Sequence, residues 1–307
     1  MKIDSKQQFQ PTRAALKDIL VAYGLALVNF RSAETGIENC TLFIETNKGP
    51  YVLRIYRRMR KSDRDISTEL DFIAYLDKHD VPVASALANL DGAYVTHLDG
   101  WRSILMPHIE GTHANHYNKA LVTELSTWQA KLHQLALIYD SENTPLEPLR
   151  FLQDRTFLPS VNMRDLNNDA RLFMERAASY SVPLSSGLPT GLCHLDYDID
   201  NILVGKNDTV TAILDFDDLT YAPLVVCLGY TMRDVITHGS LRLAEAYLKS
   251  YNERRTLTDM ERDLLPRIML YRHYMLGAFV AVAGDMDDET TAKYIHRENM
   301  FLSWRAG

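Results

Sequence analysis

Residues Cys193–Asp218, with the sequence CHLDYDIDNILVGKNDTVTAILDFDD, combine one histidine with seven carboxylates and two asparagines. Carboxylate and amide oxygens are the ligands that hard cations such as Mg²⁺ prefer. Asp196 precedes the two apolar runs of this stretch, Asn201 comes just before the first run, and Asp215 follows the second. The residue types therefore predict a divalent-cation site, provided that the fold brings these oxygens together.

The two apolar runs are expected to form a β-hairpin. Residues Ile202–Gly205 and Thr209–Leu214 are mostly apolar or β-branched, and Lys206–Asp208 between them has the composition of a tight turn. Antiparallel pairing of the runs would place Asn201 nearly opposite Asp215, with α-carbons ~5 to 8 Å apart. Two oxygen ligands would then converge at one end of the hairpin.

Two other interpretations of the acidic stretch compete with a magnesium site. A calcium-binding loop of the D-x-D-x-[DN]-G type requires a glycine where this chain has Asn201 and a bidentate glutamate where it has Asn207. A solvated acidic turn explains Asp208, but it does not explain acids placed at the mouth of an apolar hairpin. The spacing favours the magnesium site.

The same stretch resembles a known enzyme superfamily. His194, Asp196 and Asn201 form the pattern H-x-D-x-x-x-x-N, and the segment ILDFDD with Asp215 follows the expected hairpin. This pair of motifs is similar to that of the aminoglycoside phosphotransferase, choline kinase and homoserine kinase superfamily. The resemblance implies an α+β, two-lobed, protein-kinase-like fold that uses ATP and Mg²⁺. Residues 1–106 would form a small antiparallel-sheet lobe that binds the nucleotide, and residues 107–307 a mainly helical lobe for catalysis and substrate binding.

The hydrophobic pattern of the first part predicts mainly strands. A helix is expected over residues 12–23, and a second helix starts at Ser62, where Asp65 gives a capping box. Strands are expected at Leu25–Phe30, Cys40–Glu45, Tyr51–Tyr56, Tyr94–His97 and Trp101–Met106.

The second part is predicted to be mainly helical, with the hairpin inserted in it. A polar segment with two prolines at 141–148 is expected to be a loop. Apolar residues at helical spacing predict helices over Leu121–Leu137, around Phe173, over Leu241–Tyr251 and within Leu257–Ala283.

The resemblance implies that the first lobe contacts the nucleotide. In kinase-like folds a strand cation that holds the α- and β-phosphates is oriented by a glutamate of the next helix, and Arg54 and Glu69 fit those positions. Arginine stands where lysine is usual and presents a planar fork in place of a point charge. Without the resemblance, a surface arginine and a surface glutamate are the preferred interpretation, since six basic residues fall between Arg54 and Arg64.

Two further segments of this lobe are similar to nucleotide contacts of the superfamily. The strand that stops at a proline in MPHIEGT resembles the hinge, where adenine would bond to the carbonyl of Pro107 and the amide of Ile109. The segment GIEN, with Gly36 and Asn39, is similar to the N-lobe of homoserine kinase-like members. On the residues alone, an ordinary strand exit and a plain hairpin turn fit these two segments.

In the mechanism that the resemblance implies, Asp196 accepts the proton of the substrate hydroxyl. Asn201 and Asp215 would hold the magnesium ion, and Asp217 is a further candidate for binding the metal or its ligands. His194 is expected to brace the loop through hydrogen bonds and to take no part in the chemistry. We therefore expect an ATP-dependent kinase that phosphorylates a small-molecule hydroxyl group.

Two residues depart from the family pattern. Leu195 stands where relatives often have glycine, and Cys227, in APLVVCLGY, stands where many relatives have an aspartate that braces the second lobe. A catalytically inactive kinase-fold protein that binds nucleotide is therefore an alternative function. A metal-dependent phosphohydrolase built on His194 is a third reading, but the sequence lacks a second histidine cluster for it.

Composition narrows the class of partner. The formal net charge of −7 divides into +1 for residues 1–106 and −8 for residues 107–307. An acidic second part argues against a nucleic-acid partner and suits a cationic small molecule. The acceptor expected from the resemblance is an amino alcohol, a homoserine-like amino acid, an aminoglycoside or a sugar.

The sequence also predicts a cytoplasmic protein without a membrane partner. The apolar run Tyr274–Ala283 is about half of the roughly 20 residues that span a bilayer. The polar segment MKIDSKQQFQPTR gives no sign of an export signal. The three cysteines are odd in number and lack metal-ligand spacing, which indicates a reducing compartment.

Overall fold

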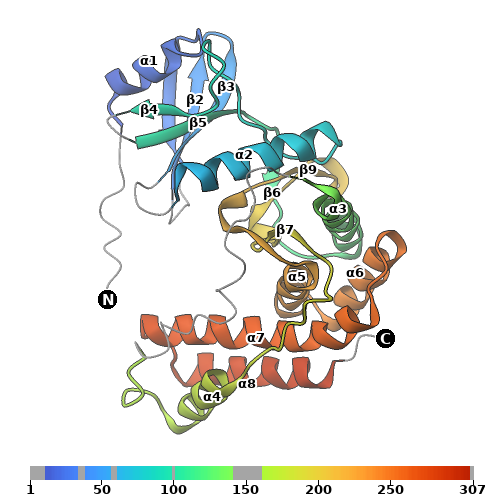
Figure 1. The fold of residues 1–307 in the computed structure, drawn as a ribbon. Helices are drawn as coiled ribbons and strands as arrows, with labels where there is room; N and C mark the ends of the chain where they lie inside the picture. Colours follow the sequence, from blue (N-terminus) through green and yellow to red (C-terminus); the bar gives the residue numbers. More distant parts are fainter. Residues whose placement is uncertain (1–10, 34–38, 57–60, 99–100, 141–160, 305–307) are drawn as a thin grey trace. The chain divides into compact units, whose positions relative to one another are not determined.

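The computed structural model describes residues 11–33, 39–56, 61–98, 101–140 and 161–304 (Figure 1). Gly36, one of the expected nucleotide contacts, and the loop expected at 141–148 lie outside the described residues. The backbone contacts divide the chain into two compact units. The first unit extends to Gly111 and includes Thr211–Leu214, and the second unit contains the other described residues from Thr112 onward.

A five-stranded sheet in the order β1-β2-β3-β5-β4 forms the body of the first unit (Figure 1). Every pair of neighbouring strands in it is antiparallel, as the sequence predicts. The elements of this unit are α1 (Arg13–Val21), β1 (Leu27–Ser32), β2 (Cys40–Thr46), β3 (Gly49–Ile55), α2 (Asp63–Lys78), β4 (Thr96–Leu98) and β5 (Trp101–Pro107).

The core of the first unit joins α1 to the sheet. Leu16 and Leu20 lie one turn apart on α1, and Leu42 and Ile44 lie two residues apart on β2, so that each pair shares one face of its element. Together with Leu53 of β3 these side chains are buried in one hydrophobic cluster. Burial of this apolar face therefore anchors the strands on which the expected nucleotide contacts lie.

Helix α2 begins with the capping box that the sequence predicts. The Ser62 hydroxyl accepts a hydrogen bond from the Asp65 amide (3.2 Å), and the Asp65 carboxylate accepts one from the Ser62 amide (2.8 Å). Arg102 of β5 donates to the carbonyl oxygen of Lys61 (2.6 Å), just before the cap. These bonds fix the start of the helix against the sheet and so fix the position of Glu69, two turns into the helix.

The second unit is mainly helical and contains short strands. Strand β7 pairs antiparallel with β10, and a small sheet has the order β6-β8-β9. The elements from residue 112 onward are β6 (Thr112–His113), α3 (Lys119–Ile138), α4 (Asn168–Ser179), β7 (Thr190–His194), η2 (Ile199–Asn201), β8 (Ile202–Val204), η3 (Lys206–Asp208), β9 (Val210–Ile213), η4 (Phe216–Asp218), β10 (Leu219–Pro223), α5 (Leu224–His238), α6 (Leu241–Arg254), α7 (Asp259–Ala283) and α8 (Asp288–Ser303). Of these, β9 belongs to the first unit from Thr211 onward.

The expected hairpin is confirmed as β8, η3 and β9. At its turn the Gly205 amide donates to the carbonyl of Thr209 (2.9 Å). Asn207 and Asp208 adopt left-handed backbone conformations, with φ of 60° and 58°. Asparagine and aspartate tolerate this conformation better than other residues with side chains, which explains the turn composition between two apolar strands.

Two helices of the second unit were not predicted. Helix α5 is buried on nearly all sides, so its sequence lacks the alternation of apolar and polar residues that marks a surface helix. In α8 the buried residues include Thr291 and Glu298, so polar side chains interrupt the apolar stripe. In both helices tertiary packing hides the helical period from the sequence.

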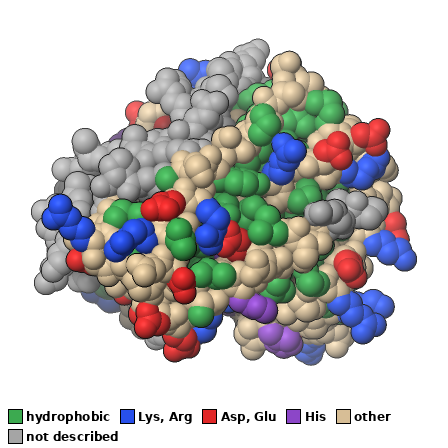
Figure 2. All heavy atoms as spheres, turned by 90° about the horizontal axis from the view of Figure 1, so that it is seen from below, with side chains coloured by type: hydrophobic (Ala, Val, Ile, Leu, Met, Phe, Trp, Pro, Cys, Tyr) green, Lys and Arg blue, Asp and Glu red, His purple; other side chains and the backbone are tan. Residues whose placement is uncertain are grey.

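Charges of both signs lie on the face of the molecule drawn in Figure 2, where basic and acidic side chains are interspersed among hydrophobic ones. The acidic side chains of the described residues do not gather in a single patch on this face (Figure 2). Within the described ranges, no helix is long and apolar enough to cross a membrane.

A buried aromatic cluster joins α4, α7 and α8. The His273 ring stacks on Tyr294, with centroids 4.9 Å apart, and meets the edge of Phe173 at 5.7 Å. Its Nε2 donates to the backbone carbonyl of Tyr294 (2.9 Å). Burial, with the positive charges of Arg233 and Arg297, lowers the pKa of His273 to about 3. The imidazole is therefore neutral in the folded protein at ordinary pH.

This burial predicts a loss of stability in mild acid. Below about pH 6.5 the unfolded chain protonates its histidine, whereas folded His273 stays neutral down to about pH 3. The free energy of unfolding should fall over that range, by up to about 1.4 kcal/mol per pH unit from this group. The variant His273→Gln should show a shallower slope in urea denaturation at several pH values. The same substitution at exposed His116 is the control, and identical slopes for His273→Gln and the wild type would contradict the assignment.

Candidate active site

The expected nucleotide contacts that the structure describes lie in the first unit, and Glu69 of α2 is the most buried polar residue among them. Glu69 is only 1% exposed, and its carboxylate accepts hydrogen bonds from Lys61 Nζ, as a salt bridge, and from the Tyr56 hydroxyl (3.1 Å). The Arg54 guanidinium on β3 lies over the Tyr56 ring, 5.7 Å from its centroid. A buried carboxylate needs such partners, because an unpaired charge is costly away from water. Glu69 therefore organises a polar cluster at the start of α2.

Lys61 is the residue of this cluster that sequence reasoning missed. It belongs to the basic segment after β3, where a run of cations is usually solvated. Its position one residue before the helix cap was the available signal, because the cap fixes the segment that leads into it. The role of Arg54 toward phosphate stays a prediction, and Lys61 joins it as a second cation beside Glu69.

The expected hinge residues and Asn39 lie at strand ends. Pro107 is the last residue of β5 and pairs with Tyr51 of β3, and Ile109 follows it two residues later. The His108 ring between them contacts Phe43 edge to face, with centroids 5.9 Å apart. Asn39 lies directly before β2. The contacts of these residues with a nucleotide stay predictions.

The second unit contains the loop that carries Asp196, which follows β7. Asn201 closes the loop: its side-chain nitrogen donates to both the backbone carbonyl and the Oδ2 atom of Asp196, each at 2.9 Å. Asp196 remains partly exposed, with 37% of its side chain accessible. Because the Asn201 nitrogen makes both bonds, the amide oxygen is the atom that Asn201 can offer to a cation. The structure thus brings together a candidate base and a candidate metal ligand.

His194 braces this loop, as the sequence predicts. Its fully buried ring lies 4.5 Å from the Phe216 ring, and its Nδ1 accepts a hydrogen bond from the Asp196 amide (3.3 Å). Leu195 is buried, and its backbone does not adopt the left-handed conformation that favours glycine. A leucine therefore fits at this position without backbone strain.

Helix α5 holds the loop that carries Asp196 through two hydrogen-bond donors that lie one helical turn apart. The Cys227 thiol donates to the carbonyl of His194 (3.0 Å), and the Thr231 hydroxyl donates to the carbonyl of Tyr197 (2.9 Å). Gln129 of α3 donates to the Thr231 hydroxyl (2.7 Å). Burial raises the pKa of Cys227 to about 12, so the side chain stays a protonated thiol that can donate. Cys227 thus holds the loop although the family's usual aspartate is missing.

Asp215 has a strained backbone. It adopts a left-handed conformation (φ 59°, ψ 70°), which costs on the order of 1 kcal/mol for a residue with a side chain. Its Oδ1 accepts a hydrogen bond from the amide of Asp217, a residue that is itself buried. Such strain is concentrated at functional positions. The strained backbone of Asp215 agrees with the expectation that this residue binds a metal ion at the end of the hairpin.

The expected metal ligands mix an amide with carboxylates. In the described part of the chain, no three residues among His, Cys, Asp and Glu are grouped so as to hold a metal ion. Magnesium is commonly held by one or two carboxylates together with substrate phosphates and water, so a purely protein-built cluster is not required. The donor types of Asn201, Asp215 and Asp217 fit that chemistry, and their binding of Mg²⁺ stays a prediction.

Asp198 carries less than a full negative charge near neutral pH, which limits the negative charge of the loop that carries Asp196. Burial raises its pKa to about 7, and the charges of Asp196, Asp234 and Asp200 add to the rise. Its Oδ1 accepts a hydrogen bond from the Asp200 amide (3.0 Å) and so caps η2. Asp198 thus supports the loop that carries Asp196, and near neutral pH it binds a proton part of the time.

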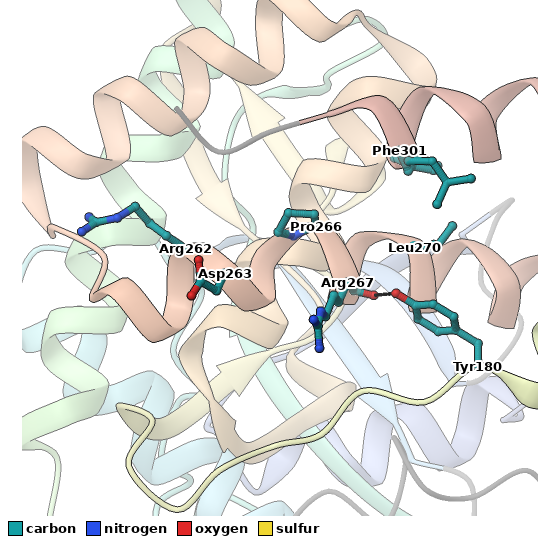
Figure 3. Close-up of a pocket in the computed structure, with 8 residues that line it drawn as sticks. Tyr180, Arg262, Asp263, Pro266, Arg267, Leu270 and Phe301 are labelled. Carbon is teal, nitrogen blue, oxygen red and sulfur yellow. Dashed lines mark hydrogen bonds between the residues drawn. The ribbon is translucent and has the colours of Figure 1, made fainter.

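A cavity of about 330 Å³ lies elsewhere in the second unit (Figure 3). Tyr180 borders it and donates from its hydroxyl to the carbonyl of Arg267 on α7 (3.3 Å). None of the expected site residues lines this cavity. It is therefore not the place where Asp196 would meet a substrate.

Comparison with known proteins identifies the family. Residues 29–263 match the model of the phosphotransferase enzyme family. The chain belongs to this family. It is 26% identical to the homoserine kinase of Caulobacter vibrioides, over 83% of this chain and 82% of the relative. It is 30% identical to the homoserine kinase of Paraburkholderia phymatum, over 62% of this chain and 60% of that protein.

Similar solved structures confirm the fold. The chain is similar to an amicoumacin kinase (TM-score 0.71, 17% identity, 98% and 96% of the two chains). It is also similar to a microcompartment-associated aminopropanol kinase (TM-score 0.73, 19% identity, 94% and 95%). The expected α+β, protein-kinase-like fold is thus confirmed. With the curated relatives, the family places the protein among the small-molecule kinases.

The bracing by Cys227 predicts that this thiol is structurally required. In Cys227→Ala the buried carbonyl of His194 loses its donor, and we expect the free energy of unfolding to fall by about 1 to 3 kcal/mol. Turnover should fall as well, because the loop that carries Asp196 loosens. Cys227→Ser keeps a donor and should lose less on both counts. Urea denaturation and steady-state kinetics measure the two effects, and an alanine variant as stable as the wild type would contradict the account.

Proposed function

We propose that this kinase transfers the γ-phosphate of ATP to a hydroxyl group of a small molecule, with Asp196 as the general base and Mg²⁺ as the metal cofactor. The observation that carries the proposal is the double hydrogen bond from Asn201 to Asp196. It holds a candidate base and a candidate metal ligand in one rigid loop. The related amicoumacin kinase was solved with AMP-PNP and Ca²⁺, which supports a nucleotide and a divalent cation as cofactors.

The acceptor belongs to one of four classes in this proposal: amino alcohols, homoserine-like amino acids, aminoglycosides or sugars. The curated relatives named as homoserine kinases and the structural relative named as an aminopropanol kinase favour the first two classes. These names also favour an active kinase over a protein that only binds nucleotide.

Phosphoryl transfer depends mainly on alignment and on neutralised phosphate charge. Asp196 is partly exposed and accepts the hydroxyl proton as the oxygen attacks. The amide oxygen of Asn201 and the carboxylate of Asp215 would hold Mg²⁺, with Asp217 behind them. The bound ion supplies positive charge to the nucleotide phosphates.

The first unit contributes the nucleotide contacts in this proposal. Arg54 holds the phosphates, and the Lys61–Glu69 pair orients the cations around them. The carbonyl of Pro107 and the amide of Ile109 bond to the adenine. Gly36 and Asn39 contribute further nucleotide contacts in this proposal, because the GIEN segment resembles the N-lobe of homoserine kinase-like proteins.

We also propose that the protein works in the cytoplasm. Cys193 and Cys227 are free, buried thiols. Burial raises the pKa of both, which keeps them protonated and unreactive. A reducing compartment suits this use of cysteine as a structural residue.

The general-base role predicts a separation of chemistry from binding. In Asp196→Ala we expect turnover to fall by roughly 10² to 10⁴, while the affinity for Mg²⁺–ATP stays close to that of the wild type. A coupled assay of ADP release and calorimetric titration of the nucleotide measure the two quantities. Asp200→Asn, at an exposed acid four residues away, is the matched control and should keep full turnover. Unchanged turnover in Asp196→Ala would rule out this mechanism.

A further inference from the structure

A fixed positive charge lies beside the candidate base. The Nη2 atom of Arg272 on α7 is 3.6 Å from Oδ1 of Asp196, and the Arg272 side chain is 18% exposed. Its guanidinium group stacks over the ring of Tyr230 on α5, 4.5 Å from the ring centroid. Stacking on an aromatic face orients a guanidinium and leaves its edge free to bind an anion.

A second arginine, Arg233 on α5, is close enough to Arg272 for the two charges to repel each other. It has no acidic partner at hydrogen-bonding distance among the described residues. Arg233 follows Tyr230 by three residues on α5, so the two side chains share one face of that helix. Arg233 is only 5% exposed, and its Nε is buried without a hydrogen-bond partner among the described residues. The nearest acidic oxygen, on Asp234, is 3.9 Å away.

The carboxylate of Asp234 is already used by other residues. It accepts hydrogen bonds from the Tyr117 hydroxyl (2.6 Å) and from His238 Nδ1 (2.7 Å). The Tyr230 hydroxyl is buried and also has no partner among the described residues. A buried guanidinium with an unpaired Nε and only a distant carboxylate is costly, and so is a buried hydroxyl without a partner, so these groups indicate an anionic ligand.

The electrostatics of the arginines agree with this interpretation. Burial lowers the pKa of Arg233 to about 10, and repulsion from Arg272 and Arg297 contributes to the decrease, against the opposing effect of Asp234. Positive charges that repel one another in the free protein gain stability when an anion binds among them.

From these contacts we infer that Arg272, Arg233 and the Tyr230 hydroxyl form an anion subsite for a carboxylate of the acceptor. The acceptor is therefore a short hydroxy acid, such as a hydroxy amino acid. The inference rests on the proposed kinase function and narrows its acceptor classes. It reverses the expectation from net charge, because the charge beside Asp196 is positive although the second part of the chain is acidic overall.

The separation of the groups limits the length of the acceptor. A hydroxyl hydrogen-bonded to Oδ1 of Asp196 and a carboxylate hydrogen-bonded to Nη2 of Arg272 would be within about 9 Å of each other, given the 3.6 Å between these two atoms and ~2.8 Å for each bond. Short hydroxy acids fit within this limit. Arg233 and Tyr230 would then bind the second carboxylate oxygen or the charge of the group as a whole.

Three acceptors with the same hydroxyl and amine test the inference: homoserine, its primary amide, and 3-aminopropan-1-ol. For the wild-type protein with Mg²⁺–ATP, we expect kcat/KM for homoserine to exceed that for the other two by roughly 10- to 100-fold, since only homoserine offers the arginines a carboxylate. Equal use of the acid and the amide would overturn the subsite while leaving the kinase function intact.

Single substitutions locate the effect. Arg272→Gln should raise KM for homoserine by roughly tenfold or more and leave KM for the amide and for ATP unchanged. Tyr230→Phe keeps the ring beneath Arg272, removes the hydroxyl, and should raise KM for homoserine by a smaller factor. Arg267→Gln, at an exposed arginine of the same helix, is the control.

Two outcomes would contradict the inference in different ways. If Arg272→Gln raises KM for ATP and not for homoserine, the anion is a nucleotide phosphate and the carboxylate subsite is wrong. If none of the three acceptors is phosphorylated, the acceptor class is wrong, and ATP consumption with sugars or aminoglycosides would still support the kinase. If no hydroxyl compound supports ATP consumption, the proposed function itself fails.

Discussion

The rest of the site depends on the hydrogen bonds that hold the loop after β7 against helix α5. Cys227 and Thr231 donate to the carbonyls of His194 and Tyr197 from one face of that helix, and Gln129 fixes the Thr231 hydroxyl from α3. All of these side chains are buried, where hydrogen bonds are stronger and unmade ones are costly. These bonds restrain the backbone of the loop on both sides of Asp196.

The charged side chains in and beside this loop then determine which ligands it can bind. Asn201 donates a hydrogen bond to the carboxylate of Asp196, the candidate base. Asp198 is partly protonated near neutral pH. Arg272 lies next to Asp196. Negative and positive groups thus alternate over a short distance, in a chain whose second part is acidic overall. The net charge of the second part of the chain therefore says little about the substrate, because an arginine lies beside the candidate base.

Sequence reasoning found the elements whose signals are local. The turn at Asn207, the capping box at Ser62 and the strands of the first unit depend on neighbouring residues, and all were predicted. Helix α5 was missed because burial on every side removes the helical period. Lys61 was missed because a run of cations is usually solvated. The donor role of Cys227 was missed because its partner, His194, is distant in the sequence and because cysteine is an unusual residue at this position. A cysteine in place of an acid cannot be recognised as a hydrogen-bond donor until the carbonyl it contacts is known.

The most direct test of a small-molecule kinase is ³¹P NMR of the protein incubated with ATP, Mg²⁺ and homoserine. The proposed function predicts a new phosphate monoester resonance that grows in step with ADP. Inorganic phosphate alone, growing in step with ADP, would show a phosphohydrolase. An unchanged ATP spectrum, for homoserine and for every other hydroxyl compound offered, would show that the protein does not turn ATP over and would contradict the central claim.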